Sequence, residues 1–191
     1  MSRESAREKI LDTASGLFAE HGFRAIGVDT IVEQSGVAKM SLYRHFPSKD
    51  DLITAYLHNI ERSVEGGMEG IVAAHPDDPR AAILAIFEDM AQGASQLAFH
   101  GCTFQAASAE FPEMTHPAHQ TALGHKQHVL ALLHRLTAQA GASNPGPLAD
   151  QLFLLMEGTL ASVRVFGGTP NPAQSLVSAV RVLLDVALPA A

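Results

Sequence analysis

The chain has 191 residues, a formal net charge of −7 and a hydrophobic share of 47%. That many apolar residues can form a sizeable core, which excludes a wholly disordered chain. The negative net charge excludes a protein that binds nucleic acid through a uniformly basic surface. The single cysteine excludes an intrachain disulfide and favours a reducing compartment. No apolar run reaches the roughly 20 residues of a membrane span, and the first residues lack the apolar core of a signal peptide. We therefore expect a cytoplasmic protein with no membrane contact.

The first predicted helix carries an apolar stripe from Ala6 to Phe18. Ser5 and Glu8 have the spacing of a capping box at its start, and Gly22 can end it because glycine tolerates the backbone conformation of a helix stop. Hydrophobic positions recur with the same helical period along almost the whole chain, and no stretch alternates over strand length. The sequence therefore predicts an all-α fold of about nine helices.

Two short helices are predicted next, at about 28–34 and 38–45, with Gly36 in the turn between them. Ser48 and Asp51 can cap the helix that follows. The remaining helices are predicted at about 50–72, after the turn at 76–79, inside 101–117, and at 123–140, 148–166 and 174–188.

Residues 28–47 (VDTIVEQSGVAKMSLYRHFP) place two short helices around one glycine, which is the layout of a helix-turn-helix and also of an ordinary helical hairpin. Between Gly36 and Lys49 there are three basic residues and no acidic one, so this surface is basic although the chain is acidic. Lys39 can donate to guanine O6 and N7, and Met40 can contact a thymine methyl. The stretch has the chemistry of a helix that reads the DNA major groove.

Residues 18–23 read FAEHGF, and residues 35–52 read SGVAKMSLYRHFPSKDDL. They resemble the patterns F-A-E-x-G-F and A-G-V-S-x-G-T-L-Y-x-H-F-x-S-K-x-x-L in the DNA-binding domain of the TetR (tetracycline-repressor-like) family. The resemblance implies a three-helix DNA-binding domain at 1–50, with its helix-turn-helix at about 28–47, and a helical ligand-binding and dimerisation domain at 51–191. Carried over position by position, the family's DNA contacts fall on Thr30, Lys39, Met40, Ser41, Tyr43, Arg44, His45 and Lys49.

Three residues depart from the family pattern. Gly27 replaces the usual Thr or Ser before the second helix, at little cost because glycine caps acceptably. Ala38 replaces a Ser cap of the recognition helix, at a cost of about 1 kcal/mol. Met40 replaces a glycine where backbone approaches DNA. These changes bear on the operator sequence and not on DNA binding itself.

The last two predicted helices suit a dimer, because the family forms a four-helix interface from them and because two copies of a recognition helix are needed to read a palindrome. The alternative is that their apolar stripes face their own core. The residues expected at the interface are Leu152, Leu155, Thr159, Val163, Leu176, Val180 and Leu183.

The resemblance also implies a ligand pocket among the middle helices. Residues 101–112 (GCTFQAASAEFP) follow a G-C-x-F-x-x-A-x-A-E-F-P segment seen in one branch of the family. Because polar groups are few in this region, we expect a small, mostly apolar effector. The candidate pocket residues, each of which could equally be plain core, are Phe87, Met90, Phe99, Cys102, Phe104, Phe111, Leu123, Met156 and Leu160.

Two alternatives concern the mode of sensing. Cys102 could sense redox state, although a lone cysteine is more often a small buried hydrophobe. The histidine cluster from His116 to His128 could bind a metal, although histidine pairs without cysteine or a fixed spacing more often are solvated imidazoles. We assign no metal ligand, no cofactor and no catalytic residue, since no nucleophile has a base and an orienting group beside it.

The sequence therefore predicts a DNA-binding transcriptional regulator that is not an enzyme. Its expected partners are a double-stranded DNA operator of palindromic sequence, a second copy of the chain and a small effector. We expect repression that the effector relieves, and activation by the effector is the alternative.

Overall fold

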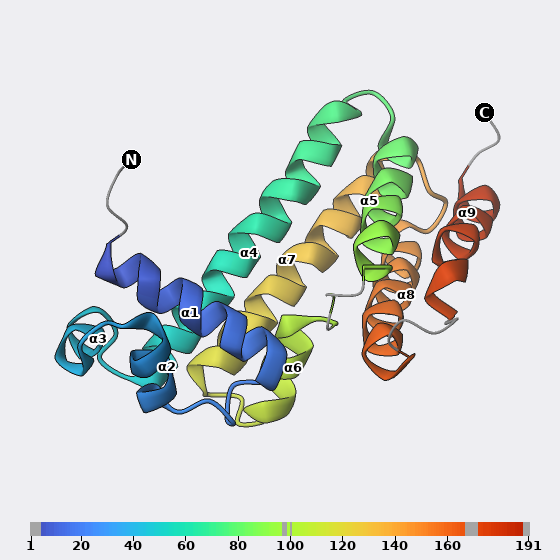
Figure 1. Ribbon diagram of the computed structural model, residues 1–191. Helices are drawn as coiled ribbons and strands as arrows, with labels where there is room; N and C mark the ends of the chain where they lie inside the picture. The colour runs from blue at the N-terminus through green and yellow to red at the C-terminus, as the bar shows by residue number, and fades with distance from the viewer. Residues whose placement is uncertain (1–4, 97–98, 100, 167–171, 189–191) are drawn as a thin grey trace. The chain divides into compact units, whose positions relative to one another are not determined.

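The computed structural model describes residues 5–96, 99, 101–166 and 172–188 (Figure 1). These residues form nine α-helices and one short 3-10 helix, with no strand among them, which confirms the all-α prediction. None of the described helices is long and apolar enough to cross a membrane. The helices are α1 (Ala6–His21), α2 (Val28–Ser35), α3 (Lys39–His45), α4 (Lys49–Ala74), α5 (Pro79–Ala94), α6 (Thr103–Glu110), α7 (Pro117–Gln139), α8 (Pro145–Phe166), the 3-10 helix Pro172–Ser175 and α9 (Leu176–Ala187).

The chain divides into two compact units. The first unit comprises Met1–Arg62 and Thr103–Gly124, and the second comprises Ser63–Cys102 and His125–Ala191. The first unit thus takes in the whole segment predicted to bind DNA and adds α6, the beginning of α4 and the beginning of α7. The predicted domain boundary after residue 50 separates the DNA-binding function from ligand binding and dimerisation, and it stays a prediction.

Local hydrogen bonds fix where α1 begins and ends. Ser5 Oγ accepts the Glu8 backbone N–H at 3.2 Å, and the Glu8 carboxylate accepts the Ser5 N–H at 2.7 Å, which confirms the predicted capping box. These bonds to Ser5 lower the pKa of Glu8 because they stabilise the carboxylate. The helix stops at Gly22, whose φ of +81° favours glycine.

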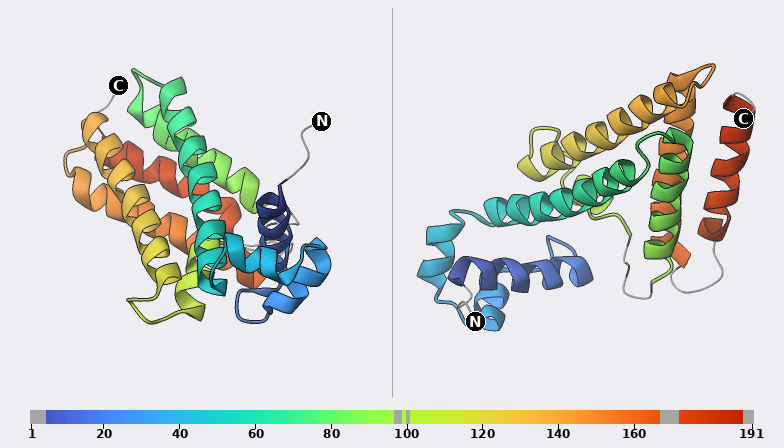
Figure 2. Two further views of the ribbon diagram at one scale, coloured as in Figure 1. Left: turned by 90° about the vertical axis from the view of Figure 1, so that its left-hand side faces the viewer. Right: turned by 90° about the horizontal axis from the view of Figure 1, so that it is seen from above.

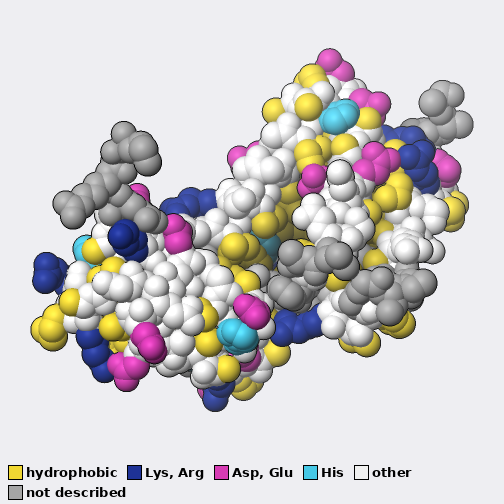
Figure 3. Space-filling view, viewed as in Figure 1, with side chains coloured by type: hydrophobic (Ala, Val, Ile, Leu, Met, Phe, Trp, Pro, Cys, Tyr) yellow, Lys and Arg dark blue, Asp and Glu magenta, His cyan; other side chains and the backbone are white. Residues whose placement is uncertain are grey.

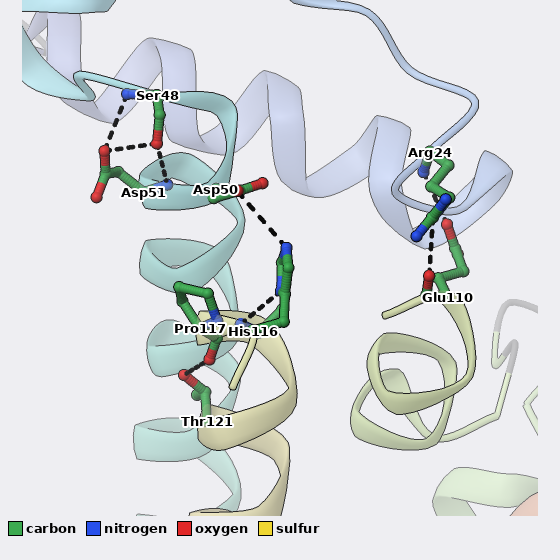
Figure 4. A network of polar contacts seen from close by, with 9 residues as sticks. Arg24, Ser48, Asp50, Asp51, Glu110, His116, Pro117 and Thr121 are labelled. Atoms are coloured by element: carbon green, nitrogen blue, oxygen red, sulfur yellow. Dashed lines mark hydrogen bonds and ion pairs between the residues drawn. The ribbon is translucent and has the colours of Figure 1, made fainter. Parts of the chain in front are cut away.

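The start of α4 uses the same device. Ser48 Oγ accepts the Asp51 N–H at 3.1 Å, and the Asp51 carboxylate accepts the Ser48 N–H at 2.9 Å (Figure 4). The predicted cap is therefore confirmed. Between α2 and α3, Gly36 adopts a left-handed φ of +65° and makes the predicted turn.

Aromatic side chains form the centre of the first unit. The centroid of the Phe23 ring lies 5.4 Å from that of Phe18, 6.0 Å from that of Tyr56 and 5.9 Å from that of Phe111. Because Phe111 follows α6, this cluster attaches the segment 103–124 to α1 and α4. Burial raises the pKa of the Tyr56 hydroxyl, and a hydrogen bond with Thr103 acts in the opposite direction.

The second unit has its own hydrophobic core, in which α5, α8 and α9 contact one another (Figures 1 and 2). Burial of these side chains is the main source of the unit's stability. The fully or nearly buried members are Ala82, Ile83, Leu84, Ile86, Phe87, Val129, Leu132, Leu133, Leu136, Leu148, Ala149, Leu152, Met156, Leu176, Val180 and Leu184.

Two helices begin earlier than predicted. α7 starts at Pro117 and not near residue 123, and α8 starts at Pro145 and not near residue 148. In both cases the proline occupies the first helical position, where its missing N–H costs nothing and its fixed φ suits the helix. His116 supports the start of α7 because its Nδ1 accepts the Ala118 N–H at 3.2 Å. The sequence prediction treated these prolines as parts of the loops.

Candidate nucleic-acid interface

The core of the first unit determines which side of α3 faces outward. α3 packs against α1 and α2, and Leu42 of α3 is completely buried, as is Ile31 of α2. Phe46, at the end of α3, is also buried. With the apolar side chains turned inward, the remaining positions of this short helix lie on its outer side.

The predicted DNA contacts occupy this outer side. Met40 is 77% exposed, which is unusual for a large hydrophobic residue, and the described part of the chain does not cover it. Figure 3 shows basic and hydrophobic side chains projecting together where α3 lies. Lys39, Met40, Tyr43, Arg44 and His45 are exposed, and Thr30, Ser41 and Lys49 are half-buried.

Lys39 has an acidic partner that the sequence analysis missed. Its Nζ lies 2.6 Å from the Asp29 carboxylate at the start of α2. This hydrogen bond, together with the charge of Asp29, raises the pKa of the lysine. Because both groups are exposed, the ion pair is weak, and Lys39 can exchange the Asp29 carboxylate for an acceptor on DNA.

Lys49 is set deeper than the residues of α3. It is the first residue of α4 and is half-buried. Burial lowers the pKa of its ammonium, with Arg24 acting in the same direction, while the carboxylates of Glu110 and Asp50 raise it. A phosphate contact would add to the counter-charges that this ammonium already has.

A polar brace holds the loop after α1 to the end of α6 (Figure 4). The Glu110 carboxylate accepts the backbone N–H groups of Phe23 at 3.1 Å and of Arg24 at 2.7 Å. In return, Arg24 Nε donates to the Glu110 carbonyl at 2.8 Å. Any Cβ on Gly22 would lie 2.7 Å from Glu110 Oε1, so the glycine also makes room for this carboxylate.

A second contact lies beside the brace. His116 stacks on the ring of Phe111 with centroids 4.2 Å apart, and its Nε2 lies 3.5 Å from the Asp50 carboxylate at the start of α4 (Figure 4). Together these contacts fix both ends of the helix-turn-helix to residues 110–116. Nothing in the sequence pattern pairs Arg24 with Glu110, because they are 86 positions apart.

The comparisons with known proteins agree with this geometry. The family described as "Bacterial regulatory proteins, tetR family" matches residues 10–56. The solved structure of SCO4454, a TetR-family transcriptional regulator from Streptomyces coelicolor, superposes with a TM-score of 0.89 at 30% identity, over 95% of this chain and 95% of that chain. The chain belongs to the TetR family of transcriptional regulators. Members of this family bind DNA operators, act as dimers and are not enzymes.

Two further relatives regulate in opposite directions. The repressor KstR2 of Rhodococcus jostii is 36% identical over 84 residues, which are 44% of this chain and 41% of that protein. The activator FasR of Mycolicibacterium smegmatis is 33% identical over 91 residues, which are 46% of this chain and 42% of that protein. Since neither match covers half of either chain, the direction of regulation here does not follow from them.

The residues predicted to line a TetR-type ligand pocket fall in both units. Phe104, Phe111 and Leu123 belong to the first unit, where the Phe111 ring packs on Phe23. The others belong to the second unit, in which Phe87, Cys102 and Met156 are buried and Met90, Phe99 and Leu160 are half-buried. The pocket stays a prediction.

The structure also shows polar groups in this part of the second unit that the sequence analysis did not consider. Lys126 Nζ donates to Cys102 Sγ at 3.3 Å and to the Glu157 carboxylate at 2.5 Å. Both charged side chains are about four-fifths buried, so the region is less uniformly apolar than the sequence analysis assumed.

The two helices expected to form the dimer interface of a TetR-family regulator each have two apolar faces. Leu152 and Val180 are completely buried in the core of the second unit, Thr159, Val163 and Leu176 are buried too, and Leu155 and Leu183 are half-buried against it. For the buried residues the structure favours the alternative that the stripe faces its own core. The exposed apolar side chains of these helices are Leu154, Val165 and Phe166 on α8 and Val182 and Val186 on α9.

Proposed function

We propose that this protein is a cytoplasmic transcriptional repressor that binds a palindromic operator as a homodimer and releases it when a small-molecule effector binds. The observation that carries the proposal is the outer side of α3, where exposed basic and polar side chains surround an exposed methionine above a fully buried Leu42. An exposed helix with this composition matches what a recognition helix needs, which is a neutral or basic face that can enter the major groove.

The residues of this face have separate roles in the proposal. Lys39, released from Asp29, donates to a guanine, while Met40 contacts a thymine methyl. Tyr43 and Lys49 hold backbone phosphates, which supply most of the affinity and make it depend on salt. The brace around Glu110 holds one end of the helix-turn-helix and the His116–Asp50 contact holds the other, so that these side chains reach the DNA together.

Dimerisation is proposed through α8 and α9. Large apolar side chains that stay exposed on adjacent helices, such as Leu154 and Val182, are typical of a protein–protein interface. A two-fold dimer would separate its recognition helices by about 34–36 Å, which is one turn of DNA. The residues that carry this contact in the proposal are the exposed ones, and the buried ones of the same helices support them from behind.

The effector is proposed to bind in the second unit. Met90, Met156 and Leu160 supply apolar contacts there, and the Lys126–Glu157 pair supplies a polar one. We therefore propose a mostly apolar effector that carries one polar group. To relieve repression, it must bind the DNA-free state more tightly than the DNA-bound state.

The test is selection of bound sequences from random double-stranded DNA with the full-length protein. The expected product is a palindrome whose two half-sites are about one helical turn apart. Recovery of no enriched sequence, or of a single asymmetric half-site, contradicts the proposal. Expression of a reporter placed behind the selected operator, with and without the gene for this protein, then distinguishes repression from activation.

A further inference from the structure

The histidines between residues 116 and 128 have two different environments. His116 lies in the first unit, whereas His125 and His128 lie in the second. His125 and His128 are three residues apart on α7 and therefore share one face of that helix. Both imidazoles approach one carboxylate oxygen of α4, because Glu65 Oε1 lies 3.9 Å from Nδ1 of His125 and 3.6 Å from Nδ1 of His128.

These two distances are too long for hydrogen bonds, whose N···O separations are about 2.7–3.2 Å. They are close to the separation between two ligands of one metal ion. Zinc bonds of about 2.0–2.2 Å to nitrogen and oxygen in tetrahedral geometry place the donor atoms about 3.4 Å apart. Glu65 Oε1 thus lies near ligand spacing from each imidazole, and rotation of the exposed His128 side chain has to bring its nitrogen toward that of His125.

Burial is graded across the cluster. The side chain of His125 is 5% exposed, that of Glu65 is 24% exposed and that of His128 is 48% exposed. The buried imidazole is held by the packing around it, and the exposed imidazole leaves the cluster open to ions from solvent. A site with one fixed ligand and one accessible ligand needs little reorganisation to bind an ion.

We propose that Glu65, His125 and His128 bind one divalent transition-metal ion. Two imidazoles and a carboxylate suit Zn²⁺ and Ni²⁺, and they require no thiolate. Three protein ligands leave a position for water or another molecule, as in sites that exchange ligands. The sequence pattern offered His125 and His128 within a possible metal-binding cluster but not Glu65, because this carboxylate comes from another helix, 60 positions before His125.

Isothermal titration of the full-length, tag-free protein with ZnCl₂ and with NiCl₂ tests the proposal. The expected result is one ion per chain for at least one of the two metals. His128→Gln and Glu65→Gln should each weaken that binding tenfold or more, because each removes one of three ligands. The buried His125 is left unchanged, since its replacement perturbs the packing of α7.

His134→Gln is the matched control. His134 also lies on α7 in the second unit and pairs with one carboxylate, with its Nε2 3.3 Å from Asp150 Oδ1. This variant should bind the metal as the wild type does. Thermal unfolding without metal checks that every variant is folded, and added metal should raise the midpoint more for wild type and His134→Gln than for His128→Gln and Glu65→Gln. Absence of binding by both metals, or binding that neither His128→Gln nor Glu65→Gln weakens, overturns the proposal.

Discussion

Replacing Glu110 tests whether residues of α6 hold the helix-turn-helix in place. In Glu110→Ala, the backbone N–H groups of Phe23 and Arg24 lose the carboxylate that accepts them at 3.1 and 2.7 Å. Phe23 is buried, so its N–H remains without an acceptor, at a cost of about 1–3 kcal/mol. Arg24 is exposed, and water replaces most of its lost bond. The expected loss is therefore about 1–3 kcal/mol in the free energy of unfolding.

Urea unfolding followed by far-UV circular dichroism measures this loss. Glu110→Gln keeps one acceptor oxygen and should lose about 1 kcal/mol. Glu113→Ala is the control, because this exposed residue lies three positions after Glu110, in the loop that follows α6, and it should stay within about 0.5 kcal/mol of the wild type. A Glu110→Ala protein as stable as this control would refute the reasoning, because the brace would then contribute nothing measurable to the free energy of unfolding.

The remaining predictions concern the DNA-binding face and the core beneath it. Asp29→Asn should tighten DNA binding severalfold at low salt, because it frees Lys39 and removes a negative charge near the phosphates; weaker binding would contradict this. Lys49→Ala should weaken binding to all sequences alike and lower the salt slope by about 2, because each copy of the dimer loses one phosphate contact, whereas Lys39→Ala should relax preference at one operator position. Binding assays over a mutated operator series distinguish the two effects. Because burial raises the pKa of Tyr56, its contribution to stability is complete below the ordinary value of 10.0 and is lost as the pH rises through the higher folded value. Urea unfolding above about pH 10 should therefore show a smaller loss of stability for Tyr56→Phe than for the wild type, and equal losses would contradict the shift.

Local features of the fold could be predicted from the sequence because they depend on residues a few positions apart. The Ser5–Glu8 and Ser48–Asp51 caps form across three residues. Gly22 likewise stops its helix through its own backbone conformation. Such contacts are present whatever the rest of the chain does, so spacing alone identifies them.

Contacts between distant segments were beyond the reach of the sequence pattern. Glu110 lies in a segment that was noted only as a possible pocket wall, yet its carboxylate binds the loop at Arg24. Asp29 belongs to the helix-turn-helix itself, but its pairing with Lys39 depends on how α2 and α3 cross. In both cases the side-chain chemistry was evident and the partner was not.

Apolar periodicity also identifies a buried stripe without saying what covers it. Leu152 and Val180 repeat at helical spacing and were assigned to a dimer interface, but their own unit covers them. Leu154 and Val182, which the described residues of the unit leave exposed, lie on the same helices. On a helix with two apolar faces, the hydrophobic spacing is the same whichever face contacts a partner. Only the packed structure distinguishes the face buried in the helix's own unit from the face left exposed.

The central claim is that the outer face of α3 binds DNA through its cations, and the salt dependence of binding to the selected operator tests it most directly. A dimer that places two or three cations per copy on phosphates releases about four to six counterions. The logarithm of the association constant should then fall linearly with the logarithm of salt concentration, with a slope of about −4 to −5. Fluorescence anisotropy with a labelled duplex measures this slope. No binding at low salt, or binding that salt leaves unchanged, would contradict the claim.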